Sequence, residues 1–165
     1  MNVSAGDALP GLDVKVTARM VIMGASSSRD WQPQHHDHAW AVNRAGTRDI
    51  FLNTPNQGGW IERYVTDWTG PLGRLGKMRF RMRKSICTGD DLSFEGVVRS
   101  VITDAAGCCW VDVDISLMVG EDRATECVAR VAIPKDDNDN PWKRAGDAWT
   151  PDAPGPLELQ SRRKD

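Results

Sequence analysis

The sequence lacks the features that mark membrane, secreted and nucleic-acid-binding proteins. No apolar run approaches the roughly 20 residues that cross a bilayer. The first 15 residues show no basic start followed by an apolar stretch, so no signal peptide is visible. The formal net charge is only −2 over 165 residues, which gives no electrostatic reason to bind nucleic acid. We therefore expect a cytoplasmic protein that binds neither membranes nor nucleic acid.

Disulfide and zinc signatures are also missing. The four cysteines stand at positions 87, 108, 109 and 127 and form no C-x-x-C pair, and the chain has only three histidines. A structural zinc site takes four Cys or His ligands at close spacing, which this set does not supply. We therefore expect reduced, buried thiols, as in a cytosolic protein.

The chain is comparatively rich in apolar residues and in tryptophan. Forty per cent of its residues are hydrophobic, which is enough for one core in a chain of single-domain length. Seven tryptophans stand against one tyrosine. Because an indole buries a large apolar area, these side chains predict broad apolar surfaces, either in the core or at a subunit contact.

Apolar spacing predicts a short strand and two helices in the first 70 residues. Alternating apolar and polar residues predict a strand over 12–16, and helical spacing predicts a helix over 18–25. A second helix is expected over 55–69, with Thr54 as its N-cap and Pro55 in its first turn. Gly70-Pro71 is expected to end it.

The period changes to two after residue 76. Alternating apolar residues separated by short turns predict four strands, over 77–83, 92–98, 111–119 and 127–133. Short turns predict an antiparallel meander, and its apolar face needs a cover that the 55–69 helix can supply. We therefore predict an α+β chain: a single hot-dog fold over 12–134, in which an antiparallel sheet wraps around a central helix. Residues 1–11 are expected to form a loose arm, and 135–165 a polar tail that is disordered or contacts a partner.

A polar loop between the two helices holds all three histidines. Asp30 and His35 lie five residues apart in it, and a loop can bring both side chains to one point. A carboxylate and an imidazole that share a water would form a proton-transfer centre near neutral pH. Spacing alone leaves two other interpretations open: a solvated surface loop, and a metal site made by His35, His36 and His38.

The same loop resembles a known motif. Asp30-x-Gln32-Pro33-x-His35 resembles the Asp-x-Asn-Pro-x-His loop of the MaoC-like (R)-specific enoyl-CoA hydratases and dehydratases, with Gln32 where that family usually has Asn. The resemblance extends over about 12–134 in the same element order. Within the family, further runs are similar to the small MaoC-type subunit of heteromeric hydratases of the cholesterol side chain: Arg29-Asp30-Trp31-Gln32, Asp49-Ile50-Phe51-Leu52-Asn53 and Arg63-Tyr64-Val65-Thr66-Asp67-Trp68.

This resemblance implies a role for each site residue. Asp30 and His35 would hold and activate the water, and the backbone N–H of Thr54 would bind the thioester carbonyl, although the family has Gly at that position. The expected substrate-binding residues are Asn53, Gly58 and Gly59. For Arg81, Arg83 and Lys84 two interpretations stand: a solvated sheet face, or contacts to CoA phosphates.

The resemblance also implies a reaction. The expected enzyme is a hydro-lyase that adds water across the double bond of a bulky, steroid side-chain enoyl-CoA, with no metal or redox cofactor and CoA only as part of the substrate. The expected partner is a second MaoC-like subunit in a heterotetramer, with a homodimer as the alternative. Two other functions stay open: a hot-dog acyl-CoA thioesterase, which attacks the carbonyl rather than the alkene, and a non-catalytic partner subunit of a hydratase complex.

Overall fold

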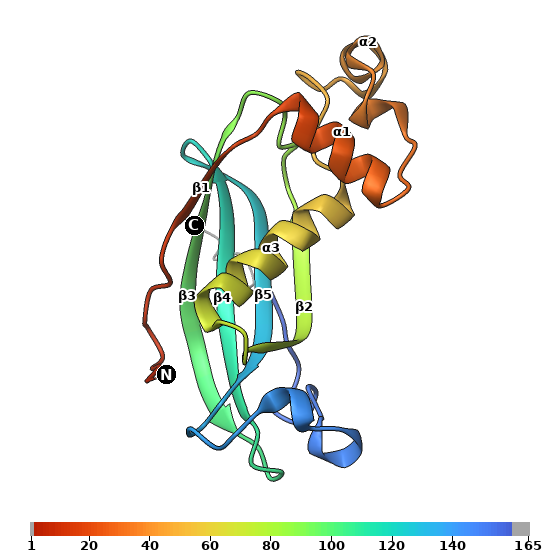
Figure 1. Ribbon diagram of the computed structural model, residues 1–165. Helices are drawn as coiled ribbons and strands as arrows, with labels where there is room; N and C mark the ends of the chain where they lie inside the picture. Colours follow the sequence, from red (N-terminus) through yellow and green to blue (C-terminus); the bar gives the residue numbers. More distant parts are fainter. Residues whose placement is uncertain (1, 160–165) are drawn as a thin grey trace.

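A computed structural model describes residues 2–159 of the chain (Figure 1). No helix in this part of the chain is long and apolar enough to cross a membrane. The larger elements, in chain order, are β1 (Leu12–Lys15), α1 (Ala18–Ser27), α2 (His38–Trp40), α3 (Thr54–Thr69), β2 (Arg74–Met82), β3 (Asp91–Thr103), β4 (Cys109–Val119) and β5 (Asp122–Ile133). Short helical turns cover Pro33–His35, Ala41–Ala45, Pro141–Lys143 and Gly146–Ala148.

The five strands form one antiparallel sheet in the order β1-β3-β4-β5-β2. Strands β3, β4 and β5 make the expected meander. The expected place of β2 beside β3 is wrong, because β2 pairs with β5 at the far edge, with Phe80 opposite Cys127. The connection from 83 to 90 does not turn back as a hairpin. It is held instead by residues 50–52, through the Leu52 N–H that donates to the Ile86 carbonyl at 2.9 Å.

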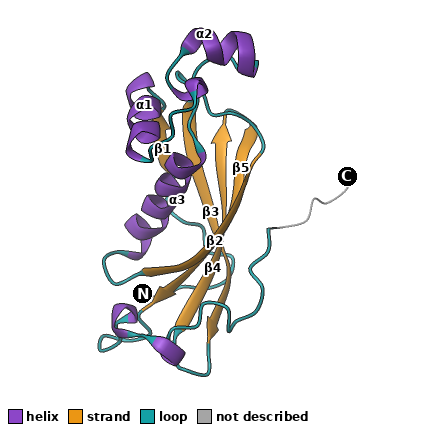
Figure 2. Ribbon diagram, turned by 90° about the vertical axis from the view of Figure 1, so that its right-hand side faces the viewer, coloured by secondary structure: helices purple, strands orange, loops and turns teal. Residues whose placement is uncertain are grey.

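Helix α3 lies across one face of this sheet, which is the hot-dog arrangement that the sequence predicts (Figures 1 and 2). Its apolar stripe of Ile61, Tyr64 and Val65 is buried against the sheet and belongs to the main core cluster. Tyr64 packs against Phe94 of β3, with ring centroids 5.4 Å apart. The burial of this stripe, rather than intrinsic helix propensity, fixes α3 on the sheet.

The N-cap of α3 is Asn53, so the predicted N-cap at Thr54 is wrong. Asn53 has an extended backbone, and its Oδ1 accepts the Asn56 N–H at 3.0 Å, so Thr54 becomes the first helical residue. Asn and Thr both make good caps. The amide nitrogen of Asn53 also donates two hydrogen bonds to side chains outside the helix. A threonine hydroxyl has only one hydrogen and could donate only one such bond.

Helices α1 and α2 gather at the end of the sheet where α3 begins (Figure 1). Helix α1 is capped by Thr17, whose Oγ1 accepts the Met20 N–H at 3.2 Å. It approaches α3 so closely at Gly24 that a Cβ there would lie 1.9 Å from the Asn56 Nδ2. This tight crossing places the loop after α1 directly over the first turn of α3.

Residues 135–148 lie at the end of the sheet where β5 finishes, and residues 149–159 continue along the sheet face opposite α3 (Figures 1 and 2). The Trp149 ring packs at a tilt against the buried Trp110 ring, with centroids 4.8 Å apart, and Leu157 is 2% exposed. Arg130 of β5, itself buried, donates to the carbonyls of Pro151 and Gly155. Residues 135–159 are thus held on the sheet by Trp149, Leu157 and the Arg130 guanidinium, where disorder was one of the two expectations. The other expectation, contact with a partner, stays a prediction. Residues 160–165 of the expected tail lie outside the described part.

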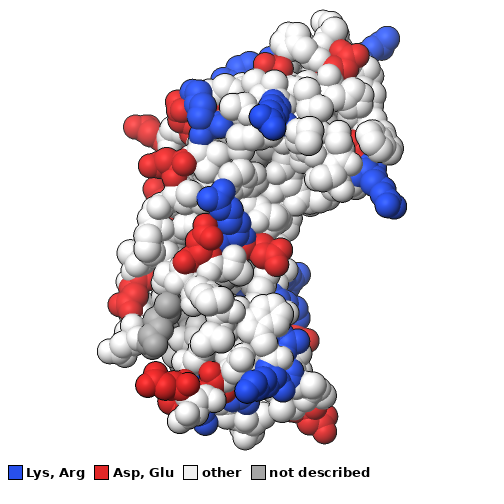
Figure 3. Space-filling view, in the orientation of Figure 1, with Lys and Arg blue, Asp and Glu red and all other residues white. Residues whose placement is uncertain are grey.

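The surface carries both charge signs. Figure 3 shows acidic and basic side chains interspersed over the face seen in Figure 1, with uncharged surface between them. Many of the charges pair with a neighbour, as Arg83 does with Glu126 at 2.5 Å and Lys84 with Asp122 at 2.6 Å. The distribution agrees with the small net charge of the sequence.

Candidate active site

The end of α1 sets the position of Asp30. Ser28 caps the helix, and Arg29 follows in the left-handed conformation with φ 55°. The Arg29 N–H donates to the Ser26 carbonyl at 3.1 Å and the Asp30 N–H to the Ala25 carbonyl at 2.9 Å. These two bonds are those of a Schellman motif, which reverses the chain at a helix end. The Asp30 side chain therefore starts from a backbone fixed to α1.

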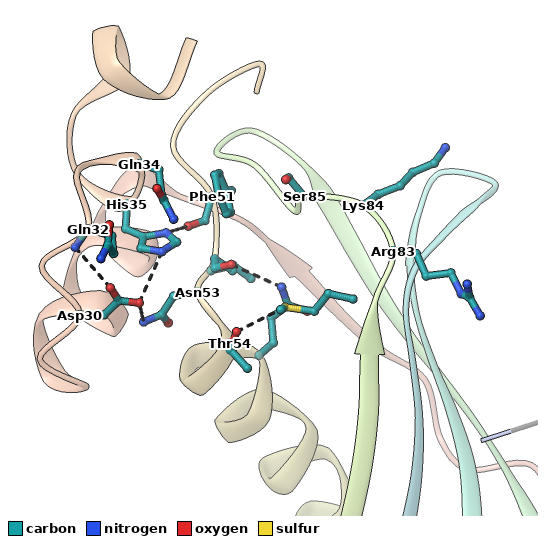
Figure 4. A pocket seen from close by; sticks show the side chains of 13 residues that line it. Asp30, Gln32, Gln34, His35, Phe51, Asn53, Thr54, Arg83, Lys84 and Ser85 are labelled. Carbon is teal, nitrogen blue, oxygen red and sulfur yellow. Dashed lines mark hydrogen bonds and ion pairs between the residues drawn. The ribbon is translucent and has the colours of Figure 1, made fainter. Parts of the chain in front are cut away.

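His35 comes to the same point through the short turn Pro33–His35. Its ring is only 4% exposed, which rules out a solvated histidine. Its Nε2 lies 3.4 Å from the Asp30 Oδ2, so the loop does bring the two predicted side chains together (Figure 4). On the other side of the ring, Nδ1 lies 2.8 Å from the Phe51 carbonyl oxygen.

The Phe51 carbonyl determines the tautomer of His35. A carbonyl oxygen only accepts hydrogen bonds, so Nδ1 must carry a hydrogen to make this contact. In the neutral ring Nε2 is then an unprotonated acceptor. It faces Asp30 Oδ2, which is also an acceptor when ionised. A water molecule, which has two hydrogens to donate, is chemically suited to the position between them.

Asp30 is held in its ionised form. The amide of Asn53 donates from Nδ2 to Asp30 Oδ2 at 2.9 Å, and this bond is the main cause of a lowered Asp30 pKa. Burial acts in the opposite direction, while the Gln32 N–H at 3.3 Å lowers the pKa further, as the charge of His35 does whenever its ring is protonated. The arrangement is thus a carboxylate beside an imidazole that can accept a proton.

The first turn of α3 supplies an N–H group to the same place. Pro55 has no N–H, the Asn56 N–H donates to Asn53 Oδ1, and the Gln57 N–H donates to the Asn53 carbonyl. Thr54 is the first helical residue, so its N–H has no acceptor within the helix. A helix start also favours a developing negative charge. Its position suits a group that binds a thioester oxygen.

These groups line one cavity of about 370 Å³, a size typical of small-molecule sites. Figure 4 shows the pair of Asp30 and His35 on one side and Thr54 on the helix start beside it. The same loop and helix, together with the two further segments 51–53 and 82–85, complete the wall, whose other residues are Gln32, Gln34, Phe51, Leu52, Asn53, Gln57, Met82, Arg83, Lys84 and Ser85.

Gly58 and Gly59 do not line this cavity, although the sequence analysis expected them to contact substrate. A Cβ on Gly58 would meet the Phe80 ring of β2 at 3.7 Å. Gly59 borders a separate hollow that Trp60 and Arg63 also line. Successive helical residues point about 100° apart, and Gln57 is the residue of this turn that faces the cavity.

Phe51 and Gln57 line the cavity but were not among the predicted site residues. Phe51 acts through its backbone carbonyl, which no side-chain pattern reveals. Gln57 could have been recognised in the sequence, because it is a polar residue one turn before Ile61 on an otherwise apolar helix face. It is 1% exposed, and its Oε1 accepts the Thr125 hydroxyl at 2.7 Å.

The three basic residues divide between cavity and sheet face. Arg83 and Lys84 line the cavity, whereas Arg81 does not. Each has an acidic neighbour on β5: Glu126 lies 3.5 Å from Arg81 and 2.5 Å from Arg83, and Asp122 lies 2.6 Å from Lys84. A phosphate that binds there has to compete with these carboxylates.

A metal site is not visible in the described residues. In 2–159, no three side chains of His, Cys, Asp or Glu come together as metal ligands. His38 Nδ1 lies 2.8 Å from Asp49 Oδ1 instead, away from His35. All four cysteines are buried and unpaired, as the sequence predicts.

Comparisons with known proteins identify a relative in sequence and several in fold. No protein-family model matches the sequence. The beta subunit of the 3-oxo-4,17-pregnadiene-20-carboxyl-CoA hydratase of Mycobacterium tuberculosis is 34% identical over 96 residues, which are 58% of this chain and 74% of that protein.

Solved structures show the same fold. A chain of the ChsH1-ChsH2 complex from M. tuberculosis has a TM-score of 0.73 and 27% identity, covering 81% of this chain and 99% of that one. An (R)-hydratase from A. caviae involved in PHA biosynthesis has a TM-score of 0.71 and 18% identity, covering 80% and 98%. With 34% identity over three quarters of a curated hydratase subunit and a shared hot-dog architecture, the chain belongs to the MaoC-like family of hydro-lyases.

Proposed function

We propose that this chain is the catalytic subunit of an enoyl-CoA hydratase that acts on a bulky, steroid side-chain enoyl thioester. The observation that carries the proposal is the pair of Asp30 and His35. An ionised carboxylate and an imidazole nitrogen able to accept a proton face each other at 3.4 Å, in a cavity that Thr54, at the start of α3, also lines. Hydration of an enoyl thioester needs these three groups: a water site, a proton acceptor and a donor to the carbonyl.

The reaction would proceed as follows. The thioester carbonyl accepts the Thr54 N–H, which draws electron density away from the β-carbon. Water held between Asp30 Oδ2 and His35 Nε2 attacks that carbon, and Nε2 takes one proton from the water. The resulting enolate takes this proton at the α-carbon, directly or through Asp30. One water is consumed, and both side chains return to their initial protonation states.

The floor of the cavity bears on the size of the acyl group. Gln57 fills the space between α3 and β5, where its amide bonds to the Thr125 hydroxyl and the Leu52 carbonyl. An acyl group larger than the cavity of about 370 Å³ would therefore extend out of this chain instead of into its core. The curated relative from M. tuberculosis is the beta subunit of a 3-oxo-4,17-pregnadiene-20-carboxyl-CoA hydratase, which supports a steroid acyl group.

A second hot-dog subunit would receive that acyl group. The relative is a beta subunit, and the ChsH1-ChsH2 structure is a complex of two chains. In this chain the outer edge of β3 is covered by β1 and the N-terminal arm only as far as Val98. Beyond it, Val101 and Ile102 are more than a third exposed. An edge strand with apolar side chains favours pairing with another chain, and we propose a heterotetramer with a second MaoC-like subunit.

The CoA part would lie at the basic side of the cavity. Arg83 and Lys84 border it, and either could exchange its β5 carboxylate for a phosphate oxygen. Arg81 lies outside the cavity wall, so we place it on the sheet face. The chemistry requires no metal or redox cofactor, and CoA takes part as a portion of the substrate.

The test compares the chain alone with the chain co-expressed with a second hot-dog subunit. Size-exclusion chromatography gives the assembly, and both samples are assayed on crotonyl-CoA and on a steroid enoyl-CoA. Loss of the enoyl absorbance without release of free CoA is the expected result, and Asp30→Asn is the matched inactive control. Release of free CoA would identify a thioesterase, and no reaction in any assembly would identify a non-catalytic subunit. A homodimer that hydrates only crotonyl-CoA would contradict the steroid and the heteromer parts.

A further inference from the structure

We propose that Asn53 is a positioning residue, which fixes the Asp30 carboxylate against His35 and does not itself contact substrate. The inference rests on the proposed hydratase function and deepens it. It replaces the role in substrate binding that the sequence analysis expected for Asn53.

The polar atoms of Asn53 are taken up by the protein. Nδ2 donates to Asp30 Oδ2 and to Ser28 Oγ, both at 2.9 Å, and Oδ1 accepts the Asn56 N–H at 3.0 Å. The residue is 2% exposed. Both amide hydrogens are used, and a flipped amide would turn its oxygen toward the Asp30 carboxylate and leave the Asn56 N–H without its acceptor. One orientation of the side chain is therefore fixed.

This side chain joins two helix ends. Ser28 is the C-cap of α1, and its hydroxyl donates back to the Gly24 carbonyl at 2.9 Å, which leaves its oxygen to accept from Asn53. Asn56 lies in the first turn of α3 and contacts α1 at Gly24 and Met20. Through Asn53, the position of Asp30 is therefore fixed relative to the two helices and does not depend on the loop alone.

The contact falls on the oxygen atom that faces the histidine. Asp30 Oδ2 accepts the Asn53 amide and lies 3.4 Å from His35 Nε2 (Figure 4). Asp30 remains one quarter exposed, so without Asn53 its carboxylate is free to turn toward solvent. The same bond is the main cause of the lowered Asp30 pKa, with His35 as the titratable group that also faces it. Asn53 thus sets both the direction and the charge of the carboxylate.

Two substitutions separate this role from helix capping. Asn53→Ser keeps a capping oxygen but removes the amide donor, and Asn53→Asp keeps the cap and the shape but turns a negative oxygen toward Asp30. We expect Asn53→Ser to lower kcat by about 10-fold or more, as is typical for residues behind a catalytic group, with KM changed less than about twofold. Asn53→Asp should lower kcat further.

A titration of Asp30 gives the readout that a purely structural role would not move. The ¹³C NMR signal of the Asp30 carboxyl, assigned by its loss in Asp30→Asn, should titrate at higher pH in Asn53→Ser than in the wild-type chain. In the Asp30→Asn background, Asn53→Ser should cause little further loss of kcat, because the two changes act through one group. The control Thr17→Ala removes the cap of α1, so it should lower Tm without moving the Asp30 signal.

Three results would overturn the inference. The first is a raised KM at unchanged kcat in Asn53→Ser, which would make Asn53 a substrate-binding residue. The second is an equal loss of kcat in the presence and absence of Asp30, and the third is an unmoved Asp30 titration. If the wild-type chain hydrates nothing in any assembly, the proposed function fails, and the NMR titration still decides whether Asn53 controls the Asp30 carboxylate.

Discussion

The backbone carbonyl of Phe51 holds the Nδ1 of His35 at 2.8 Å, on the side of the ring away from Asp30. Since the carbonyl can only accept, the contact leaves Nε2 free to accept a proton from water. A main-chain group thus selects which nitrogen of the imidazole does chemistry. A substitution of the Phe51 side chain should therefore leave this selection unchanged, unless it moves the backbone.

Loss of either member of the pair should abolish hydration while affecting stability differently. We expect Asp30→Asn and His35→Ala each to lower kcat/KM by at least about 100-fold, the low end for positioned acid–base groups. Asp30→Asn keeps an oxygen that can accept from Asn53, so it should lower the free energy of unfolding less than His35→Ala does. His35→Ala removes a buried ring and should lower the free energy of unfolding by about 1–3 kcal/mol. Turnover within a few fold of wild type in either variant, measured by enoyl absorbance, would contradict the assigned roles.

Stability should depend on the ionisation of Asp30 in acid. The pKa of Asp30 is lowered in the folded chain from its model-compound value of 3.8, chiefly by the Asn53 hydrogen bond. A lowered folded pKa stabilises the native state above pH 3.8, and this contribution is lost as the pH falls through the folded pKa. Urea unfolding of wild type and Asp30→Asn should therefore differ most near neutrality and converge below pH 3.8. A difference that is constant with pH would show that Asp30 has no such linkage.

Replacement of Arg29 by glycine should stabilise the chain. Arg29 occupies the left-handed position of the Schellman motif, at φ 55°, where a side chain is unfavourable and glycine is not. We expect Arg29→Gly to raise the free energy of unfolding by about 0.5–1 kcal/mol, measured by urea denaturation. Arg29→Ala, which keeps the Cβ but removes the guanidinium, is the control and should give no gain. Equal effects of the two variants would assign the result to the charge and not to the backbone.

The segment 135–159 should contribute to stability. Trp149 lies between the Trp110 ring, at 4.8 Å, and the Arg74 guanidinium, at 3.6 Å. We expect Trp149→Ala to lower the free energy of unfolding by about 2 kcal/mol, since it removes a packed aromatic ring. Trp142→Ala, at a side chain that is 59% exposed, is the matched control and should cost far less.

Removal of the whole segment should cost more than Trp149→Ala. A chain that ends at residue 135 loses the two carbonyls that accept from Arg130 Nη1, although the ion pair of Arg130 with Asp112 remains. It also uncovers the apolar side chains of Trp110 and Ala132, which is the larger loss. Circular dichroism during thermal unfolding would show a lower Tm. An unchanged Tm in the truncated chain would mean that the segment does not hold the outer face of the sheet.

Much of the fold could be predicted because it depends on local signals. Period-two apolar residues such as Val111 and Val113 of β4 identify the strands, and the stripe around Ile61 identifies α3. The order of the strands was harder. The sequence from 83 to 90 resembles a long turn, and its pairing with residues 50–52 is a contact between distant parts of the chain that no local pattern reveals.

The candidate site divides in the same way. Asp30 and His35 could be found from their spacing and the resemblance of their loop to a known motif. The cap at Asn53, the carbonyl of Phe51 and the turn of α3 that faces the cavity all depend on how α1 crosses α3, which is a tertiary relationship. The contacts of residues 135–159 with the sheet could not be foreseen, because their polar, Pro- and Gly-rich composition resembles disorder, whereas Trp149, Leu157 and Arg130 hold the segment.

The placement of 135–159 restricts how subunits can be added to this one. Two sheets that stack back to back lie about 10 Å apart, and residues 149–159 already occupy that layer on the outer face. An assembly that leaves the segment in place has to grow sideways, along the β3 edge or past the helical end of the molecule. Such sideways growth extends the sheet in one plane and sets the cavities of neighbouring chains on the same side of it. A long ligand that leaves one cavity is thereby directed across a shared surface and not through a sheet.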